Sequence, residues 1–145
     1  MAVSFTNNFK NILDKLKSVL RTEFKGALPV FIGHNTKEIG NQYIRLDPAG
    51  SELNEYSISS EMREFTVNMY FYYSEPNINE KSLDQGLRIT SRIEALIHDN
   101  MTMTLADSTE SFNCRVQTTD LNALEDENEY VVQFVWRGQH LGNTG

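Results

Sequence analysis

The feature that most constrains the fold is a ten-residue stretch, Glu64 to Tyr73, in which apolar and polar side chains alternate. Because successive side chains of a β-strand point to opposite sides of the sheet, this alternation predicts a strand with one buried face. A strand cannot bury that face alone, so other elements must cover it. The predicted core-facing residues are Phe65, Val67, Met69, Phe71 and Tyr73.

The other face of this predicted strand is polar near its start and aromatic near its end, where Tyr70 and Tyr72 stand. Aromatic side chains are large apolar groups that gain free energy when they are covered. Two kinds of cover are consistent with the sequence, a neighbouring strand of the same sheet or a partner subunit. Both tyrosines are therefore candidate interface residues.

Two amphipathic helices are predicted, over residues 5–24 and 81–98, because apolar residues recur there at intervals of three and four. Gly26 is placed to end the first helix in a left-handed conformation, and Ser82 with Gln85 fits a capping box at the start of the second. The predicted apolar stripes are Phe5, Phe9, Ile12, Leu13, Leu16, Val19 and Leu20 in the first helix, and Leu83, Leu87, Ile89, Ile93, Leu96 and Ile97 in the second.

Four more strands are predicted from short apolar or alternating runs. The polar stretch Ser51 to Arg63 is either an extended loop or the outer part of a hairpin arm that projects from the body. The final residues, 138–145, are expected to be a flexible tail. The four strands cover Val30–Ile32, Tyr43–Leu46 with a turn at Asp47–Gly50, Phe112–Val116 with Cys114 pointing into the core, and Tyr130–Trp136.

The resulting order is α-β-β-β-α-β-β. Strands that arrive in runs beside two helices favour an α+β fold, a mostly antiparallel sheet of about five strands with both helices packed on one face. The length of 145 residues fits one domain, which we expect over residues 1–137. No apolar run is long enough to span a membrane, so no membrane contact is expected.

The chain shows no pattern typical of a catalytic, cofactor or metal site. Its three histidines, His34, His98 and His140, have no metal-ligand spacing and are expected to be exposed to solvent. Glycines stand in none of the contexts that build a phosphate-binding loop or a nucleophile elbow. The paired carboxylates Glu52/Glu55 and Glu61/Glu64 are interpreted as solvated rather than as acid/base or calcium groups. We therefore expect no enzyme activity and no cofactor.

Charge is distributed unevenly along the chain. The net charge of −7 argues against a general phosphate-binding surface. Residues 1–25 hold five basic and two acidic residues, whereas residues 106–129 hold seven acidic and one basic residue. These segments are either two ordinary solvated faces or surfaces that meet across subunits. The candidate interface residues are Lys15, Lys17, Arg63, Tyr70, Tyr72, Glu125, Asp126, Glu127 and Glu129.

The succession of short segments along most of the chain, about residues 5–136, resembles one known family. The segments are Phe9–Leu13, Leu28–Ile32, Tyr43–Pro48, Arg63–Val67, Phe71–Tyr73 and Glu129–Phe134. In their order and in the lengths between them, the chain is similar to the small tail terminator, or tail completion, proteins of tailed bacteriophages.

This resemblance implies a virion structural protein that assembles in the host cytoplasm as a hexameric ring. Such a ring caps the head-proximal end of the tail tube and docks it to the neck of the capsid. The implied partners are the tail tube protein, a neck or head-completion protein and, in a contractile tail, the sheath. DNA passes through an acidic lumen without specific binding.

Two alternatives stay open on the sequence. A head-closure or head-tail joining protein of the neck also forms rings of small subunits. A cellular small-ligand or enzyme domain would use the face of Tyr70 and Tyr72 as a pocket.

Overall fold

The computed structural model describes residues 6–25, 27–33, 42–57, 60–74, 80–124 and 129–143. These residues form two helices and one sheet with the strand order β1-β2-β3-β6-β5-β4. The predicted α+β class and order of elements are confirmed. The elements are α1 (Asn8–Phe24), β1 (Val30–Ile32), β2 (Gln42–Tyr56), β3 (Ser60–Ser74), α2 (Glu80–Asp99), β4 (Met103–Thr104), β5 (Glu110–Leu124) and β6 (Glu129–Asn143).

Two details of the sheet differ from the prediction. It has six strands rather than about five, because Met103–Thr104 pairs with the start of β5. It is also mixed, since β1 runs parallel to β2 whereas the other pairs are antiparallel. A strand of two or three residues carries too little periodicity to be found, or to be given a direction, from sequence alone.

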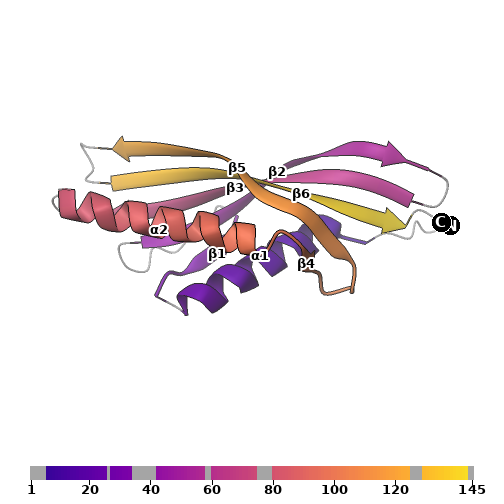
Figure 1. Ribbon diagram of the computed structural model, residues 1–145, viewed down its shortest axis with the longest axis horizontal. Helices are drawn as coiled ribbons and strands as arrows, with labels where there is room; N and C mark the ends of the chain where they lie inside the picture. Colours follow the sequence, from indigo (N-terminus) through magenta and orange to yellow (C-terminus); the bar gives the residue numbers. More distant parts are fainter. Residues whose placement is uncertain are drawn as a thin grey trace.

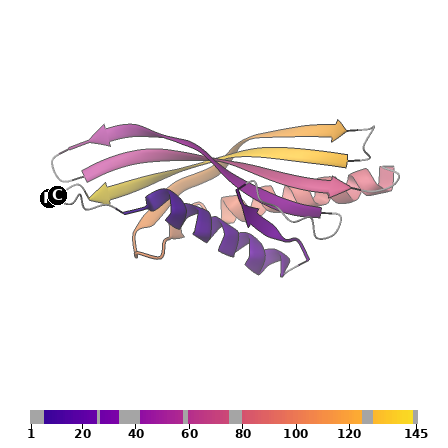
Figure 2. The same ribbon diagram turned by 180° about the vertical axis from the view of Figure 1, so that it is seen from behind.

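The sheet is long and strongly twisted. Strands β2, β3, β5 and β6 have fifteen residues each, cross near the middle of the molecule and splay towards its two ends (Figures 1 and 2). Both helices lie on the same face. At one end of the long axis is the β5–β6 hairpin together with the start of α2, and at the other end is the β2–β3 hairpin.

The strand predicted over Glu64–Tyr73 is confirmed as the centre of β3. Its five predicted core-facing residues are at most 5% exposed. Strand β3 pairs with β6 along its whole length, from Ser60 opposite Asn143 to Ser74 opposite Glu129. Core-facing partners on β6 therefore stand directly opposite those on β3, with Met69 paired to Phe134 and Val67 to Trp136.

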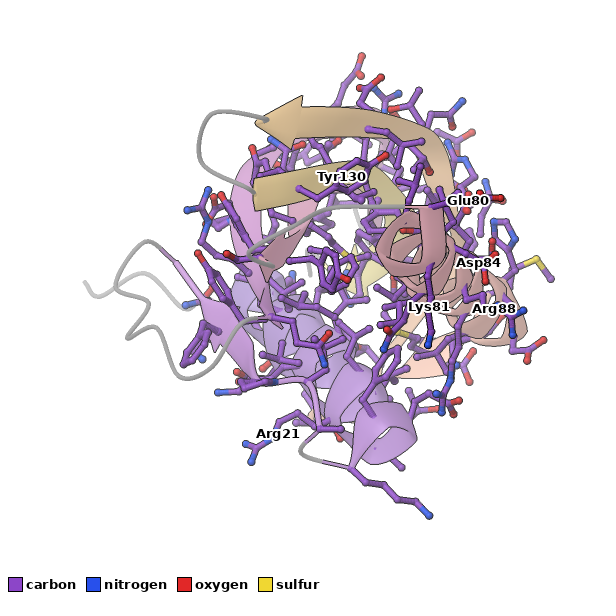
Figure 3. The ribbon with its side chains drawn as sticks, turned by 90° about the vertical axis from the view of Figure 1, so that its left-hand side faces the viewer. Arg21, Glu80, Lys81, Asp84, Arg88 and Tyr130 are labelled. Carbon is purple, nitrogen blue, oxygen red and sulfur yellow. The ribbon has the colours of Figure 1, made fainter. Side chains whose placement is uncertain are left out.

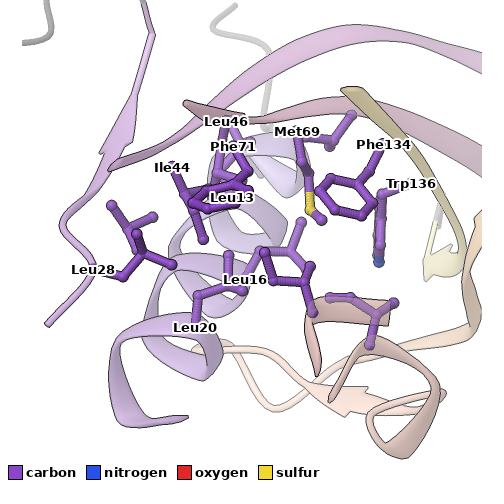
Figure 4. Packing of buried hydrophobic residues seen from close by; sticks show 14 of the residues in the cluster. Leu13, Leu16, Leu20, Leu28, Ile44, Leu46, Met69, Phe71, Phe134 and Trp136 are labelled. Carbon is purple, nitrogen blue, oxygen red and sulfur yellow. The ribbon is translucent and has the colours of Figure 1, made fainter. Parts of the chain in front are cut away.

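Helix α1 buries one stripe against the sheet, formed by Ile12, Leu13, Leu16, Leu20 and Phe24. Its first turn is capped by Asn7, whose side chain accepts a hydrogen bond from the backbone N–H of Lys10 at 3.2 Å. Its C-cap is Lys25 in a left-handed conformation, whereas Gly26, predicted for that place, lies outside the described residues. Figure 4 shows Leu13, Leu16 and Leu20 packed beneath the strand residues Met69, Phe71, Phe134 and Trp136.

Helix α2 begins at Glu80, so Ser82 and Gln85 lie within its first two turns and do not form the predicted capping box. Ile93 and Ile97 are each 1% exposed and join the core, whereas Leu83 and Leu87 near the start are 36% and 38% exposed. The predicted apolar stripe is therefore buried over only part of its length. It extends beyond the part of the core that covers it, because periodicity identifies a face but not its partner.

The predicted turn at Asp47–Gly50 is wrong, because β2 continues through these residues to Tyr56. A register shift between Pro48 and Gly50 absorbs the irregularity as a β-bulge. Of the two predicted alternatives for Ser51 to Arg63, an extended loop or the outer part of a hairpin, the structure shows the hairpin. We refer to the outer parts of β2 and β3, residues 47–56 and 60–63, as the arm.

A second bulge, in β5, changes the face to which Phe112 belongs. Asn113 adopts a positive φ of 54°, and the register shifts between Phe112 and Arg115. Cys114 is buried as predicted, but Phe112 pairs with Gln139 and lies on the opposite face of the sheet. Simple alternation fails here because the bulge adds one residue to the strand.

The predicted tail over residues 138–145 is also corrected, since β6 continues to Asn143 and pairs with the outer part of β3. One glycine of this segment, Gly138, is required for packing. Gly138 lies beneath the ring of Trp136, where a Cβ atom would come within 2.5 Å of that ring. Residues 144–145 lie outside the described residues.

His140, predicted to be exposed, is 3% exposed on the core face of this extension of β6. Its Nε2 is 2.9 Å from Thr109 Oγ1, which in turn donates to Asp107 Oδ1 at 2.6 Å. Burial lowers the pKa of His140 from its ordinary value of 6.5, and the charges of Asp107 and Glu61 only partly oppose this effect. His140 is therefore held neutral within the fold.

Replacing Gly138 with alanine is expected to destabilise the protein by about 1–3 kcal/mol, because the added methyl group must displace the buried Trp136 ring. Urea unfolding followed by tryptophan fluorescence measures this change. Gly50→Ala is the matched control, since a Cβ at Gly50 meets no atom within 4 Å. Equal stability of the two variants would contradict the packing role.

The stability of the fold should fall as the pH is lowered through the ordinary histidine pKa of 6.5. Below that pH His140 takes up a proton more readily in the unfolded chain than in the folded chain, so protonation favours unfolding. The free energy of unfolding should fall by at most about 1.4 kcal/mol per pH unit. The decline continues until the pH reaches the lowered pKa of the folded state. Urea titrations at a series of pH values from about 7 downwards follow this decline.

His140→Gln should flatten this dependence, and His98→Gln, at the exposed end of α2, should keep it. A wild-type slope in His140→Gln would show that another group titrates.

Candidate assembly surfaces

The sheet face opposite the helices, here called the open face, carries Tyr70 and Tyr72 from β3. Within the described residues no helix covers this face (Figures 1 and 2). Tyr43 of β2 stands opposite Tyr72 in the register, and their rings stack at a centroid distance of 4.6 Å and an angle of 17°. The neighbouring strand thus supplies part of the cover predicted for the two tyrosines.

An arginine completes this aromatic cluster. The guanidinium of Arg45 lies 4.6 Å from the ring centroid of Tyr70 and 5.5 Å from that of Tyr72. Cation–π contacts of this kind contribute about 0.5–1 kcal/mol each at exposed sites and more when water is excluded. The ring of Phe31 packs edge-on against Tyr43 at 6.0 Å. The tyrosine faces are therefore occupied by their own neighbours, which argues against a ligand pocket formed between them.

Arg45 also forms an ion pair with Asp47, its Nε lying 3.1 Å from Asp47 Oδ2. Both side chains are mostly buried, at 18% and 13% exposure. Asp47 Oδ1 is buried without a hydrogen-bond partner among the described residues. Because separating two mostly buried charges would leave each of them unpaired, this ion pair is a fixed feature of the face and not a freely solvated one.

Further along the open face, three strands bring charges together. Glu64 of β3 lies 3.5 Å from Arg115 of β5 and 3.7 Å from Arg137 of β6. Glu64 is 18% exposed, whereas the arginines are 30% and 43% exposed. The open face is thus aromatic at one end and charged at the other.

Lys15 and Lys17 lie far from these tyrosines, on α1 in the helical layer. Both are half-buried, and Lys17 lines a shallow concavity formed only by α1 residues, together with Asp14, Ser18, Arg21 and Thr22. This concavity is the free outer surface of the helix. Lys17 and Arg21 therefore lie together on the outer surface of α1.

Arg63 lies on the arm, on the same side of the sheet as the helices. Its Nε lies 3.0 Å from Glu61 Oε1, and its Nη1 donates to Ser51 Oγ at 3.2 Å. Together with Glu61 and Phe65 it borders a concavity at the start of α1. Arg63 thus belongs to neither the open face nor the outer surface of α1.

The predicted acidic residues Glu125, Asp126 and Glu127 lie outside the described residues, and Glu129 is the first residue of β6, opposite Ser74. The candidate interface residues are consequently spread over several surfaces. The structure joins Tyr70 with Tyr72, but it separates these two from Lys15, Lys17 and Arg63. Sequence spacing could not show this, because the surfaces are defined by which side of the sheet each strand presents.

The buried polar groups near the end of β6, Cys114 and His140, interact with neighbouring side chains of the fold. The Cys114 thiol is 3.3 Å from Ser111 Oγ, and burial raises its pKa, which disfavours the reactive thiolate. His140 hydrogen bonds to Thr109 and not to this thiol. Among the described residues, no three His, Cys, Asp or Glu side chains come together as a metal-ligand set. No described helix is long and apolar enough to cross a membrane.

Sequence reasoning missed a set of large hydrophobic residues that the fold leaves exposed. Most of them lie in segments whose apolar residues were predicted to be in the core or in a loop. The only sign of such a residue in the sequence is that it is apolar where the helix or strand periodicity does not require an apolar residue. This sign is weak. They are Leu53, Tyr56, Leu83, Leu87, Met101, Leu121 and Leu141, with exposures between 36% and 71%.

Comparisons with known proteins match this chain at the level of the fold. No protein-family model and no curated protein matches the sequence. A chain from the virion of a native gene transfer agent particle superposes with a TM-score of 0.56 at 9% identity, covering 95% of this chain and all of that one. A second solved chain gives a TM-score of 0.62 at 16% identity, covering 94% of this chain and 97% of that one.

Both matches extend over nearly the full length of both chains. At these identities they show a shared fold. The arrangement of long twisted strands with two helices on one face is therefore found in other proteins, one of which is part of a virion.

Proposed function

We propose that this protein is a structural component of a virion, and that within the virion it is the tail terminator. The observation that carries the proposal is the match over 95% of the chain to a complete chain from a virion particle. The resemblance of the sequence segments to phage tail terminators supports the narrower role. In that role the protein forms a hexameric ring that caps the head-proximal end of the tail tube.

The surfaces described above support an assembly role. A terminator needs unlike contacts: side to side within the ring, one face towards the tail tube, and one towards the neck or head-completion protein. The open face, the outer surface of α1 and the arm are separate surfaces of different character. In a contractile tail, the sheath would be a further partner.

The proposed role requires no chemistry. The Cys114 thiol is buried with a raised pKa, and the buried His140 is held neutral by its surroundings. DNA would pass through the ring without specific binding, since a net charge of −7 per chain disfavours contact with phosphates. Function therefore resides in surfaces.

A first test is the mass of the purified protein under native conditions, alone and bound to tail tubes. We expect an assembly with the mass of six chains, because the proposed ring is closed and consists of six identical subunits. A protein that stays monomeric both in solution and on tubes would contradict the ring.

A second test separates the terminator from a neck protein. The purified protein is added to polymerising tube protein of the same virion, and tube lengths are measured by electron microscopy. A terminator stops growth and is found at one end of each tube. Tubes of unchanged length, together with binding to the capsid portal, would identify a head-closure or head-tail joining protein instead.

A further inference from the structure

Within the described residues the sheet has two long free edges, one at each end of the molecule (Figures 1 and 2). Strand β1 pairs with β2 only at Ile44–Leu46, so β2 is an edge over residues 47–56. Strand β4 pairs with β5 only at Glu110 and Ser111, so β5 is an edge over residues 115–124. An edge strand presents unpaired backbone N–H and C=O groups, with which another strand can pair.

The edge formed by β2 in the arm is protected against such pairing. Pro48 stands near its start and has no backbone N–H to donate. The register with β3 shifts between Pro48 and Gly50 and again between Leu53 and Glu55, so at most four consecutive residues of this edge keep one register. Proline and bulges are two of the devices by which proteins prevent edge strands from pairing.

The edge formed by β5 lacks this protection over its last seven residues. The register with β6 runs without a shift from Thr118 to Leu124. This stretch contains no proline, glycine or lysine. Its residues Thr118, Asp120 and Leu121 are exposed. Since strands in globular proteins are usually about 5–6 residues long, the stretch is long enough to pair with one complete strand.

Helix α2 covers one face of β5 but not its edge. Thr119 donates from Oγ1 to Glu94 Oε2 at 3.1 Å, which places α2 over the face on which Thr119 lies. Figures 1 and 2 show β5 as the outermost strand of the sheet at this end. Leu121 lies on the same face as Thr119 and is 47% exposed. A strand bound to the edge could therefore place an apolar side chain against Leu121.

The charge around this edge is acidic. Residues 118–129, which include the end of β5 and the connection to β6, hold five acidic residues and no basic residue. Figure 3 views this end of the molecule, and the labelled basic side chains, Lys81 and Arg88 of α2 and Arg21 of α1, lie below the β5–β6 hairpin in that view. Arg88 is moreover paired with Asp84 at 2.9 Å. Because opposite charges on facing strands are favourable, the edge favours a basic strand.

A second copy of this chain offers no such strand among its described residues. The free edge of the arm, residues 47–56, holds three acidic residues and no basic residue. Pairing of two β5 edges would bring two acidic segments together, and like charges on facing strands are unfavourable. Strands β1 and β4 have only three and two residues. The charge of the edge therefore points to a different protein as the occupant.

From these observations we infer that β5 binds an extended, basic segment of a different protein, which adds a strand to the sheet along Thr118–Leu124. Backbone hydrogen bonds supply affinity in such a contact, and the side chains supply specificity. Here the specificity comes from Lys or Arg side chains near the acidic residues and from an apolar side chain against Leu121. The contact is distinct from those between neighbours of the proposed ring.

The test measures the binding of a basic peptide to the full-length protein. The probe is a fluorescently labelled peptide of about nine residues in which Lys alternates with Val or Thr, so that one side of the extended peptide is basic. Fluorescence anisotropy gives its dissociation constant. We expect binding, and we expect a peptide with Glu in place of every Lys to bind at least about tenfold more weakly.

Hydrogen exchange followed by NMR locates the bound peptide. In the complex, alternate backbone amides between Thr118 and Leu124 should exchange more slowly, because their N–H groups gain acceptors on the added strand. The amides of residues 48–56 in the arm should exchange as they do in the free protein.

Two double variants with the same change of charge test the edge itself. Asp120→Lys with Leu121→Lys places lysines, which protect natural edges, on β5, and Glu52→Lys with Leu53→Lys does the same on the arm. Leu121 and Leu53 are 47% and 45% exposed, so both variants should fold, as circular dichroism can verify. The β5 variant should bind the basic peptide at least about tenfold more weakly, and the arm variant within about twofold of the wild type.

The inference is wrong if the basic peptide does not bind at concentrations up to about 1 mM, or if the acidic peptide binds equally well. Protected amides outside Thr118–Leu124, or equal weakening in both double variants, would also overturn it. Protection of these amides that rises with protein concentration in the absence of peptide would identify a second copy as the occupant instead. None of these measurements uses tail tubes, so their outcome is independent of the proposed function.

Discussion

The rest of the structure depends on the pairing of β3 with β6 along all fifteen residues of each strand. These two strands occupy the centre of the sheet and place Val67 and Met69 opposite Trp136 and Phe134. Each of these four side chains is at most 1% exposed. Because a shift of one residue would turn every side chain to the other face, this ladder fixes which face the helices must cover.

The strands are longer than the helical layer beneath them. Helix α1 covers the middle of the sheet and α2 covers one end, so the outer parts of β2 and β3 extend beyond both as the arm. At the opposite end the start of α2 extends past the core instead, and Leu83 and Leu87 are 36% and 38% exposed. The exposed apolar residues of β2 and of α2 thus follow from the unequal extents of the sheet and its helices.

Predictions from the sequence were correct where the local periodicity of apolar residues was strong. The centre of β3 and the helix stripe from Ile12 to Leu20 were predictable, because many residues repeat one period. The arm and the end of β6 were harder to recognise, since Ser51 to Ser57 are exposed and mostly polar and Gly138 and Gly142 are typical of a tail. The arm and the end of β6 are held in place by backbone hydrogen bonds to neighbouring strands. Such bonds cannot be recognised from the amino-acid composition of the segment. His140 was misplaced for the same reason.

The candidate surfaces were predictable only in part. By itself the sequence determined the α+β class, the order of its principal elements, the face of β3 that is buried and the unequal distribution of charge, because each depends on neighbouring residues in the chain. The tertiary structure alone decided that Tyr43 and Arg45 join Tyr70 and Tyr72, and that apolar residues such as Leu83, Leu87 and Leu141 stay exposed. Both outcomes depend on strand register, bulges and the length of the sheet relative to its helices, and these are set by contacts between residues far apart in sequence.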